Sequence, residues 1–282
     1  MILAVVGPTG VGKTKMSVAL AKKYNAIVVN ADSMQVYKEL NIGTAKVTEE
    51  EKEGVPHLLF DIVEPTDMYT VYDYQKDLRR VLEENKDKNI VIVGGTGLYL
   101  KAGLYNYEFA EETEFNPYDE LTNEELLERV KEIDPDTDIH VNNRKRLVRK
   151  LNQKVSGTDK DILLYDCKFI GLTTSRDTLY DRINKRVDIM VKDGLIDEVK
   201  ALYDKGIKSK AIMTGIGYKE LYDYFDGNIT LDEALDLIKQ RSRKYAKRQY
   251  TWFNNQMDVK WFDVNFDDFS KTIEEVIEYI GE

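Results

Sequence analysis

Short apolar runs and helical patterns alternate along the first part of the chain. Consecutive apolar residues fill positions 2–6, 27–29 and 90–93, and each run has the length of a buried strand. Residues 15–24 place apolar side chains at helical spacing directly after the first run. Because buried parallel strands are apolar on both faces and are connected through helices, this alternation predicts an α/β fold with a parallel sheet flanked by helices.

The pattern changes between residues 108 and 158. Acidic residues accumulate in the first half of this segment, and residues 121–154 show a polar helical pattern that breaks near Pro135. We therefore expect a small helical insertion domain at 108–158. It interrupts a single core, which residues 1–107 and 159–282 form together.

Further elements are predicted after the insertion. An apolar run indicates a strand at 167–172, and an apolar stripe at helical spacing indicates one long helix over 177–203. The capping-box pattern of residues 230–233 begins a second long helix. A last strand is predicted at 259–262, and a closing helix follows it at 271–280.

The turn after the first apolar run carries a phosphate-binding pattern. Residues 7–14 fit Gly-x-x-x-x-Gly-Lys-Thr between a predicted strand and a predicted helix, which indicates a P-loop NTPase-like core. In such a loop, backbone N–H groups and the helix N-terminus hold phosphate oxygens, Lys13 adds positive charge, and Thr14 offers its hydroxyl to Mg²⁺. The pattern leaves the phosphate ester open, and its residues are Gly7, Pro8, Thr9, Gly10, Val11, Gly12, Lys13 and Thr14.

The composition indicates a globular protein without disulfides. Of the 282 residues 42% are hydrophobic, and Cys167 is the single cysteine, which excludes an intrachain disulfide and a zinc site built on several cysteines. No apolar run approaches the roughly 20 residues of a membrane span, and the chain starts in a strand instead of a leader. We expect a cytoplasmic monomer with no membrane partner.

Two compact basic segments occur in a chain whose net charge is −10. The segments 144–154 and 239–248 each carry six Lys or Arg residues and no acidic residue. Local basic segments in an acidic chain are typical of a directed nucleic-acid footprint, and two solvated helix faces are the alternative. Taken alone, the charge pattern leaves both interpretations open.

Two turns after predicted strands carry candidate groups for chemistry. Asp32 follows the second predicted strand, at the carboxyl edge where ligands of doubly wound sheets bind. Its carboxylate suits a general base, although P-loop kinases often place an acid there and a turn aspartate is the structural alternative. Thr96 lies in a glycine-rich turn and offers a hydroxyl to a substrate. A tight turn with no role in the chemistry is the simpler interpretation.

Taken in order, the motifs resemble the tRNA dimethylallyltransferase family. They are GPTGVGKT at 7–14, DSMQVY at 32–37, GTAK at 43–46, GGTGLY at 94–99, RLVR at 146–149, GIGYKE at 215–220 and RKYAKRQ at 243–249 with the following TWF. The resemblance extends over nearly the whole chain, and no nucleotide kinase known to us combines these strings. With one cysteine, the chain has no counterpart of the C-terminal zinc finger of the eukaryotic relatives, so the resemblance is to the bacterial type.

The resemblance implies transfer of a dimethylallyl group from dimethylallyl diphosphate to the exocyclic amino group of the adenosine immediately 3′ of the tRNA anticodon. It implies that Lys13 and Mg²⁺ at Thr14 stabilise the departing diphosphate, with Arg186 as the first candidate for a reaching arginine and Arg182 as the second. It makes Asp32 the base that accepts the proton of the attacking amine. Thr96 would orient the adenine, which leaves the base stack to enter the pocket.

The resemblance also places a set of residues against the anticodon stem-loop of tRNA. These are Asp32, Ser33, Met34, Gln35, Thr96, Lys145, Arg146, Leu147, Val148, Arg149, Thr214, Gly215, Ile216, Gly217, Tyr218 and Lys219. It does not decide whether the segment 239–248 contacts phosphates or forms internal ion pairs. For Tyr245 and Trp252 the helical spacing favours plain core packing.

Three other functions remain open at this point. An adenylate isopentenyltransferase shares the phosphate chemistry but prenylates a free nucleotide, and the segments 146–149 and 215–220 favour tRNA over that substrate. A small-molecule P-loop kinase and an RNA-binding protein without activity are the others. The insertion is short and acidic, which leaves its contribution to tRNA affinity open.

Overall fold

The structure of the protein is a computed structural model, which describes residues 1–109, 118, 120–152 and 162–281. It divides into two compact units. One unit comprises Met1–Tyr105 together with Leu163–Glu282, and the other comprises Asn106–Ile162. The insertion predicted at 108–158 falls in the second unit, and parts of it, among them Lys154, lie outside the described residues.

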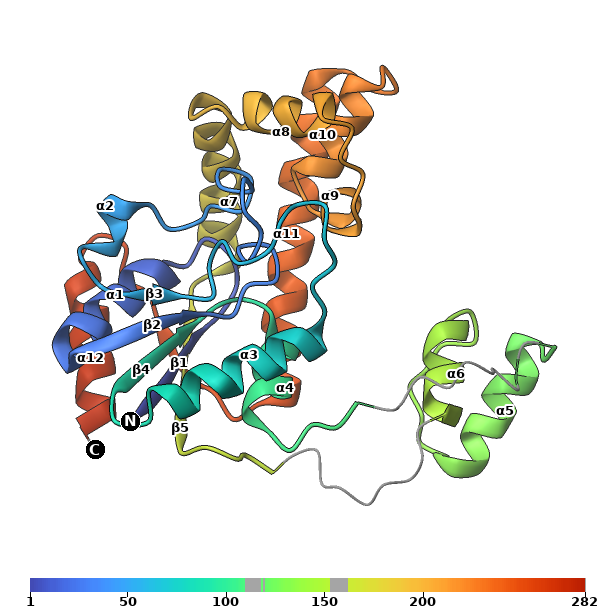
Figure 1. Cartoon of the computed structure of the whole chain (residues 1–282), viewed down its shortest axis with the longest axis horizontal. Coiled ribbons are helices and arrows are strands. Elements are labelled where there is room, and N and C mark those ends of the chain that lie inside the picture. Colours follow the sequence, from blue (N-terminus) through green and yellow to red (C-terminus); the bar gives the residue numbers. More distant parts are fainter. Residues whose placement is uncertain (110–117, 119, 153–161, 282) are drawn as a thin grey trace. The chain divides into compact units, whose positions relative to one another are not determined.

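The larger unit is built on a sheet of six parallel strands in the order β3-β2-β4-β1-β5-β6 (Figure 1). The strands are β1 Ile2–Val6, β2 Ala26–Asn30, β3 His57–Leu58, β4 Asn89–Val93, β5 Cys167–Thr173 and β6 Lys260–Asp263. The α/β prediction is therefore confirmed. Strand β3 was not predicted, because two residues are too few to show an apolar run.

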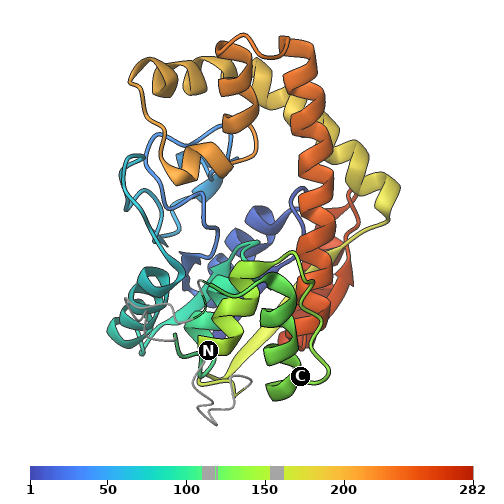
Figure 2. The same cartoon turned by 90° about the vertical axis from the view of Figure 1, so that its right-hand side faces the viewer.

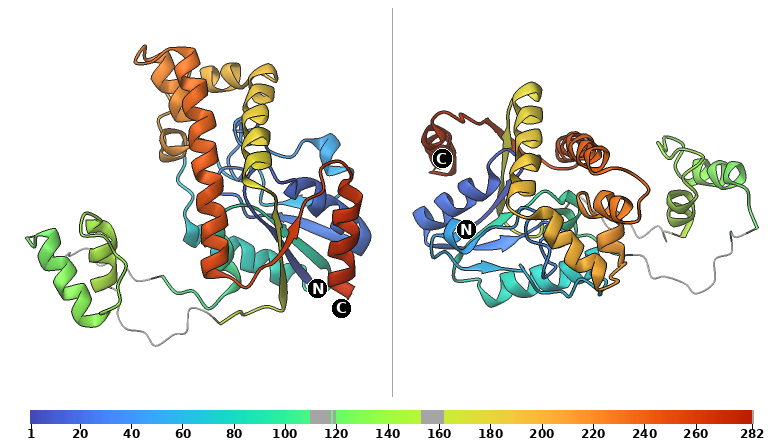
Figure 3. Two further views of the ribbon diagram at one scale, coloured as in Figure 1. Left: turned by 180° about the vertical axis from the view of Figure 1, so that it is seen from behind. Right: turned by 90° about the horizontal axis from the view of Figure 1, so that it is seen from above.

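Helices cover both faces of this sheet. On one face lie α1 Lys13–Tyr24 and α12 Phe269–Gly281, and on the other lie α3 Val71–Glu84 and α4 Gly97–Leu104 (Figure 3). Successive residues of β1 point to opposite faces, so Leu3 and Val5 join the first core and Ala4 and Val6 the second. The short helix α2 Glu49–Lys52 begins at a Thr48 capping box.

A helical layer extends beyond the carboxyl ends of the strands (Figures 1 and 2). It consists of α7 Arg176–Lys192, α8 Leu195–Asp204, α9 Lys210–Thr214, α10 Tyr218–Phe225 and α11 Leu231–Gln256. The prediction of one helix over 177–203 was wrong. Gly194 adopts φ 102°, a left-handed conformation that ends α7 and starts α8. Helix α11 does begin at the predicted capping box.

The second unit has a small core of its own. Its helices are α5 Asn123–Ile133 and α6 Arg144–Asn152, and they pack through Leu126, Val130 and Leu147 together with Ile139 of the connecting segment. Arg144 donates to the carbonyl oxygens of Leu121 at 2.5 Å and Tyr118 at 2.8 Å, which ties the start of α6 to the approach to α5.

Within the described ranges, the helices are too short or too polar to cross a lipid bilayer.

Candidate active site

The phosphate loop lies at the carboxyl end of the central strand β1. Gly12 caps α1 with φ 95°, and a Cβ on Gly7 would lie 2.5 Å from the Leu172 carbonyl oxygen, so both positions require glycine. Lys13 Nζ folds back over the loop and donates to the carbonyl oxygens of Gly7 at 3.0 Å and Pro8 at 2.8 Å. The loop therefore has the geometry that the sequence predicts, with its lysine held over the turn.

Burial lowers the pKa of Lys13 to about 8. The Asp32 carboxylate opposes this shift and the Arg186 guanidinium adds to it, so the three groups lie close enough to interact. Below pH 8 the ammonium is charged and available to an anion. An anion bound beside it would restore the pKa, because an opposite charge stabilises the protonated form.

This shift predicts a pH-dependent affinity for a diphosphate ester. The affinity of the free protein should be constant below about pH 7.5 and should fall by up to about tenfold per unit above pH 8, where Lys13 loses its proton before binding. Calorimetric titration at several pH values measures this. Lys13→Arg keeps its charge and should bind without this dependence, whereas an equally steep profile in that variant would assign the proton to another group.

Two arginines of α7 contact the phosphate loop. Arg186 Nη1 donates to Thr9 Oγ1 at 3.2 Å, and Arg182 Nε donates to the Gly10 carbonyl oxygen at 3.0 Å. The Arg182 guanidinium also lies 3.7 Å from the centre of the Phe266 ring. Burial lowers the pKa of Arg186, and the neighbouring Asp32 raises it. Arg186 thus contacts the loop and interacts with the charge of Asp32, while Arg182 is on the exposed side of the loop.

Ser33, which follows Asp32, links the Asp32 loop to Thr96. Asp32 Oδ1 accepts from the Met34 amide at 2.9 Å, which fixes the orientation of the carboxylate. Thr96 Oγ1 accepts from the Ser33 amide at 3.0 Å and donates to Ser33 Oγ at 3.2 Å. The residues after β2 and after β4 are therefore joined directly, as parallel neighbours in the sheet allow.

Close backbone approach explains the glycines around Thr96. A Cβ on Gly94 would lie 2.2 Å from the Ala31 carbonyl oxygen, and a Cβ on Gly97 would lie 1.9 Å from Cε3 of Trp252. Both distances are far shorter than any carbon contact, so the turn reaches its place only without these side chains. The GGTG string thus brings Thr96 to the end of β2.

We expect Gly97→Ala to lower the free energy of unfolding by about 1–3 kcal/mol, because the new methyl group overpacks against the Trp252 ring. Urea denaturation followed by circular dichroism measures the change. Gly281→Ala is the control, since a Cβ there meets no atom within 4 Å. Equal stability of the two variants would show that the Trp252 contact is not tight.

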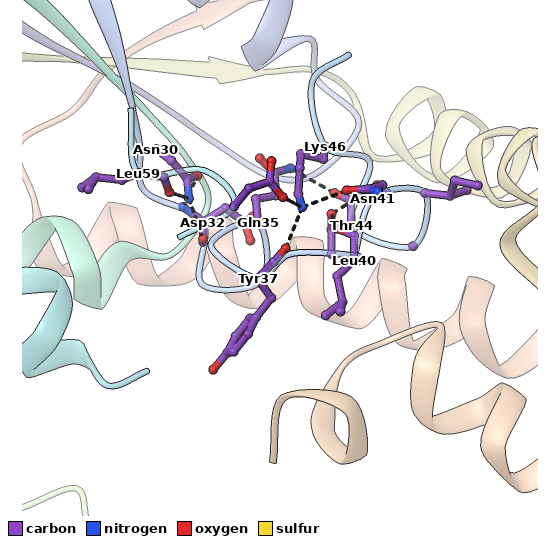
Figure 4. A network of polar contacts seen from close by, with 12 residues as sticks. Asn30, Asp32, Gln35, Tyr37, Leu40, Asn41, Thr44, Lys46 and Leu59 are labelled. Carbon is purple, nitrogen blue, oxygen red and sulfur yellow. Dashed lines mark hydrogen bonds and ion pairs between the residues drawn. The ribbon is translucent and has the colours of Figure 1, made fainter. Parts of the chain in front are cut away.

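Hydrogen bonds within the chain hold the loop that carries DSMQVY and GTAK (Figure 4). Gln35 Nε2 donates to the Thr44 carbonyl oxygen at 3.0 Å. The buried Lys46 donates to the Tyr37 carbonyl oxygen at 2.6 Å and to Asn41 Oδ1 at 2.9 Å, and it pairs with Asp61 at 2.5 Å. The loop therefore has a defined conformation that orients Asp32 to Gln35.

Glu198 of α8 joins this loop to the GIGYKE segment, and the sequence analysis missed it. Its carboxylate accepts from the amides of Asn41, Ile42 and Gly43 at 3.0, 2.7 and 3.1 Å, and from the Tyr218 hydroxyl at 2.8 Å. Four donors on one carboxylate explain why two motifs far apart in sequence occur together. A lone acidic residue in an ordinary helical pattern gives no sequence signal for such a role.

Comparison with known proteins identifies the family. A family model described as IPP transferase matches residues 35–256. The tRNA dimethylallyltransferase of Anoxybacillus flavithermus is 46% identical, with 99% of this chain and 96% of the relative covered. The tRNA dimethylallyltransferase of Bacillus subtilis is 47% identical, with 93% of this chain and 90% of the relative covered. The chain belongs to the IPP transferase family.

Solved structures of this family share the fold. The full-length tRNA isopentenylpyrophosphate transferase of Bacillus halodurans superposes with a TM-score of 0.77 at 45% identity, and covers 99% of this chain and 95% of its own. A eukaryotic dimethylallyltransferase acting on tRNA gives a TM-score of 0.83 at 26% identity, with 98% of this chain and 77% of the other chain covered. The resemblance inferred from the motifs is confirmed.

Part of the predicted tRNA set of this IPP transferase lies beside Asp32. Gly215 packs against Met34, since a Cβ there would lie 2.7 Å from Met34 Cε, so the segment 214–219 adjoins the DSMQVY loop. Thr214 is exposed and Lys219 is half-buried. The Tyr218 side chain is fully buried against Glu198, so it offers no free side chain at that position.

The remaining predicted tRNA residues lie on α6 of the second unit. Lys145 and Arg146 are exposed, and Arg146 lies 3.4 Å from Asp138. Leu147 is fully buried in the core of that unit and Val148 packs against it, so neither offers a free side chain. The side chain of Arg149 lies outside the described residues.

The basic segment of α11 is largely engaged within the protein. Lys239 pairs with Asp188 at 2.6 Å, Arg241 pairs with the fully buried Glu220, and Arg243 Nη1 donates to Asn184 Oδ1 at 2.6 Å. Lys244, Lys247 and Arg248 are exposed, although Lys244 donates to Gln240 Oε1 at 3.4 Å and Arg248 lies over the Tyr245 ring.

Core packing, which the spacing favours for Tyr245 and Trp252, is confirmed for Trp252 only. The Tyr245 hydroxyl reaches the site instead. Burial raises the pKa of Tyr245, Asp32 raises it further, and hydrogen bonds with Thr96 and Gln249 lower it. Tyr245 was therefore not predicted as a residue of the site, because its helical position is equally typical of a core residue.

Proposed function

We propose that this chain transfers the dimethylallyl group of dimethylallyl diphosphate to the exocyclic amino group of the adenosine 3′-adjacent to the anticodon of tRNA, and releases diphosphate. The observation that carries the proposal is the grouping of Lys13, Arg186, Asp32 and Thr96 at one edge of the sheet, in a chain of the IPP transferase family. The curated relatives named above are tRNA dimethylallyltransferases.

The phosphate loop would bind the leaving group of this reaction. The diphosphate would lie against the loop amides and Lys13, with Arg186 reaching it from α7 and Arg182 from the exposed side. These cations offset the negative charge that develops on the bridging oxygen as its bond to the allylic carbon breaks. Phosphoryl transfer has no part in this proposal.

Mg²⁺ fits this site as a partner of the diphosphate. The described residues contain no cluster of three His, Cys, Asp or Glu side chains for a metal, whereas Thr14 offers a hydroxyl at the start of α1. Mg²⁺ prefers oxygen ligands and is commonly held by one or two protein groups plus phosphates and water. Held by Thr14 and the diphosphate, it would supply further positive charge to the leaving group.

The acceptor would enter beside Asp32 and Thr96. The adenine amine attacks the allylic carbon as the carbon–oxygen bond breaks, and the Asp32 carboxylate takes the proton that the amine loses. The Thr96 hydroxyl, held by Ser33, would orient the adenine, and the segment 214–219 beside Met34 would contact the anticodon loop. We propose a monomer as the working form.

Incubation with dimethylallyl diphosphate, Mg²⁺ and either unmodified tRNA or AMP tests the proposal. Prenylated adenosine should form in tRNA, at the position 3′ of the anticodon, and not from AMP. Product from AMP alone would instead assign the chain to free-nucleotide prenylation.

A further inference from the structure

Gln249 connects the two loops that carry the donor and acceptor groups. It lies in α11 and is 5% exposed. Its Oε1 accepts from the Thr9 amide at 2.9 Å, and its Nε2 donates to the Gly95 carbonyl oxygen at 3.0 Å. One side-chain amide therefore spans the phosphate loop and the turn that presents Thr96.

Gln249 packs closely against the turn that carries Thr96. A Cβ on Gly95 would lie 1.9 Å from Gln249 Nε2, so glycine at this position is what admits the amide. Thr96 directly follows Gly95. The hydrogen bond to the Gly95 carbonyl oxygen therefore fixes the peptide group that leads into Thr96, whose hydroxyl holds Ser33. A shift of Gln249 would move this turn.

Gln249 also contacts the phosphate loop directly, through Thr9. Thr9 gives its amide hydrogen to Gln249 and accepts from Arg186 at its hydroxyl. The Thr9 amide is thereby withdrawn from the loop amides that face an anion, and its role is to anchor the loop. Both polar ends of a buried amide must be satisfied, and here each is satisfied by a different loop.

We propose that Gln249 is a positioning residue, which sets the separation between the diphosphate in the phosphate loop and the amine beside Thr96. This rests on the proposed function. Gln249 acts through Thr9 and Gly95, so it affects neither substrate's affinity by itself but determines whether the two meet at reacting distance. A misplacement of about 1 Å between reacting groups costs on the order of 10²-fold in rate.

The kinetic test compares Gln249→Met and Gln249→Glu with the wild type in single turnovers. For Gln249→Met we expect a transfer rate lower by about 10²-fold, with the Kd of each substrate within about threefold of the wild type. Gln249→Glu keeps an acceptor for Thr9 but has a donor for Gly95 only when protonated. Its rate relative to the wild type should therefore rise as the pH falls from about 8 to about 5.5.

Gln75→Met is the matched control. Gln75 is also a buried glutamine, 7% exposed, and donates to the Ala102 carbonyl oxygen at 2.8 Å away from the phosphate loop. Its loss should affect thermal stability and leave the transfer rate unchanged. A Gln249→Met rate within threefold of the wild type, or a rate loss fully matched by weaker binding, would overturn the proposal.

Amide hydrogen exchange of the ligand-free proteins decides the role of Gln249 without the reaction. Peptides that cover residues 5–12 and 93–99 should both exchange faster in Gln249→Met than in the wild type, and at the wild-type rate in Gln75→Met. Unchanged exchange in either loop would contradict the positioning role. Absence of prenyl transfer by the wild type would overturn the proposed function alone.

Discussion

Replacement of Asp32 by asparagine should lower the rate of prenyl transfer by about 10²–10⁴-fold, the usual contribution of a general base. The amide has nearly the same shape and still accepts from the Met34 amide, but it cannot take the proton that the attacking amine loses. Single-turnover measurements with saturating dimethylallyl diphosphate and tRNA report the rate. Filter binding should show tRNA affinity within about threefold of the wild type.

Asp263→Asn is the control for this result. Asp263 is the last residue of β6, an edge strand of the same sheet, and is exposed. Its replacement should leave the rate unchanged. A loss of tRNA affinity in Asp32→Asn that accounts for the entire loss of activity would instead assign Asp32 to recognition.

Arg186→Met should lower the transfer rate by about 10²–10³-fold, the typical cost of removing one group that stabilises a developing anion. The Arg186 guanidinium is held against the phosphate loop by Thr9, which places it beside the departing diphosphate. The KM for dimethylallyl diphosphate should change less than the rate, because the charge on the bridging oxygen appears only as the bond breaks.

Two neighbouring positions on α7 make this prediction specific. Lys185→Met removes an exposed cation and should leave the rate within about twofold of the wild type. The transfer rate of Arg182→Met should lie between those of Lys185→Met and Arg186→Met, since Arg182 contacts the loop from its exposed side. If Arg186→Met raised KM and left the rate unchanged, Arg186 would serve binding and not bond cleavage.

Much of the core was predictable from the sequence because its strands are continuous apolar runs. β1, β2 and β4 sit at the predicted runs, and the capping box fixed the start of α11. The break between α7 and α8 was missed because the apolar stripe continues through Gly194, and a glycine inside a helical pattern often remains helical. Its left-handed conformation depends on the tertiary structure.

The site was predictable where a motif carries it and not where it depends on contacts between distant segments. Gly7 to Thr14 follow a local pattern. Asp32 and Thr96 follow predicted strands, and the family resemblance supplied their roles together with Arg186. Glu198 and Gln249 act through backbone groups more than 100 residues away, and backbone groups leave no mark in the sequence. A weak signal did exist for Gln249, a polar residue between Tyr245 and Trp252 on the apolar stripe of α11.

The central claim is that the phosphate loop holds a leaving diphosphate. Dimethylallyl diphosphate labelled with ¹⁴C in the prenyl group and ³²P in the diphosphate tests it most directly, in a reaction with unmodified tRNA and Mg²⁺. We expect ¹⁴C to enter the tRNA while ³²P is released as intact diphosphate, in equal amounts. Transfer of ³²P to the tRNA, or its release as orthophosphate in step with the reaction, would contradict the account.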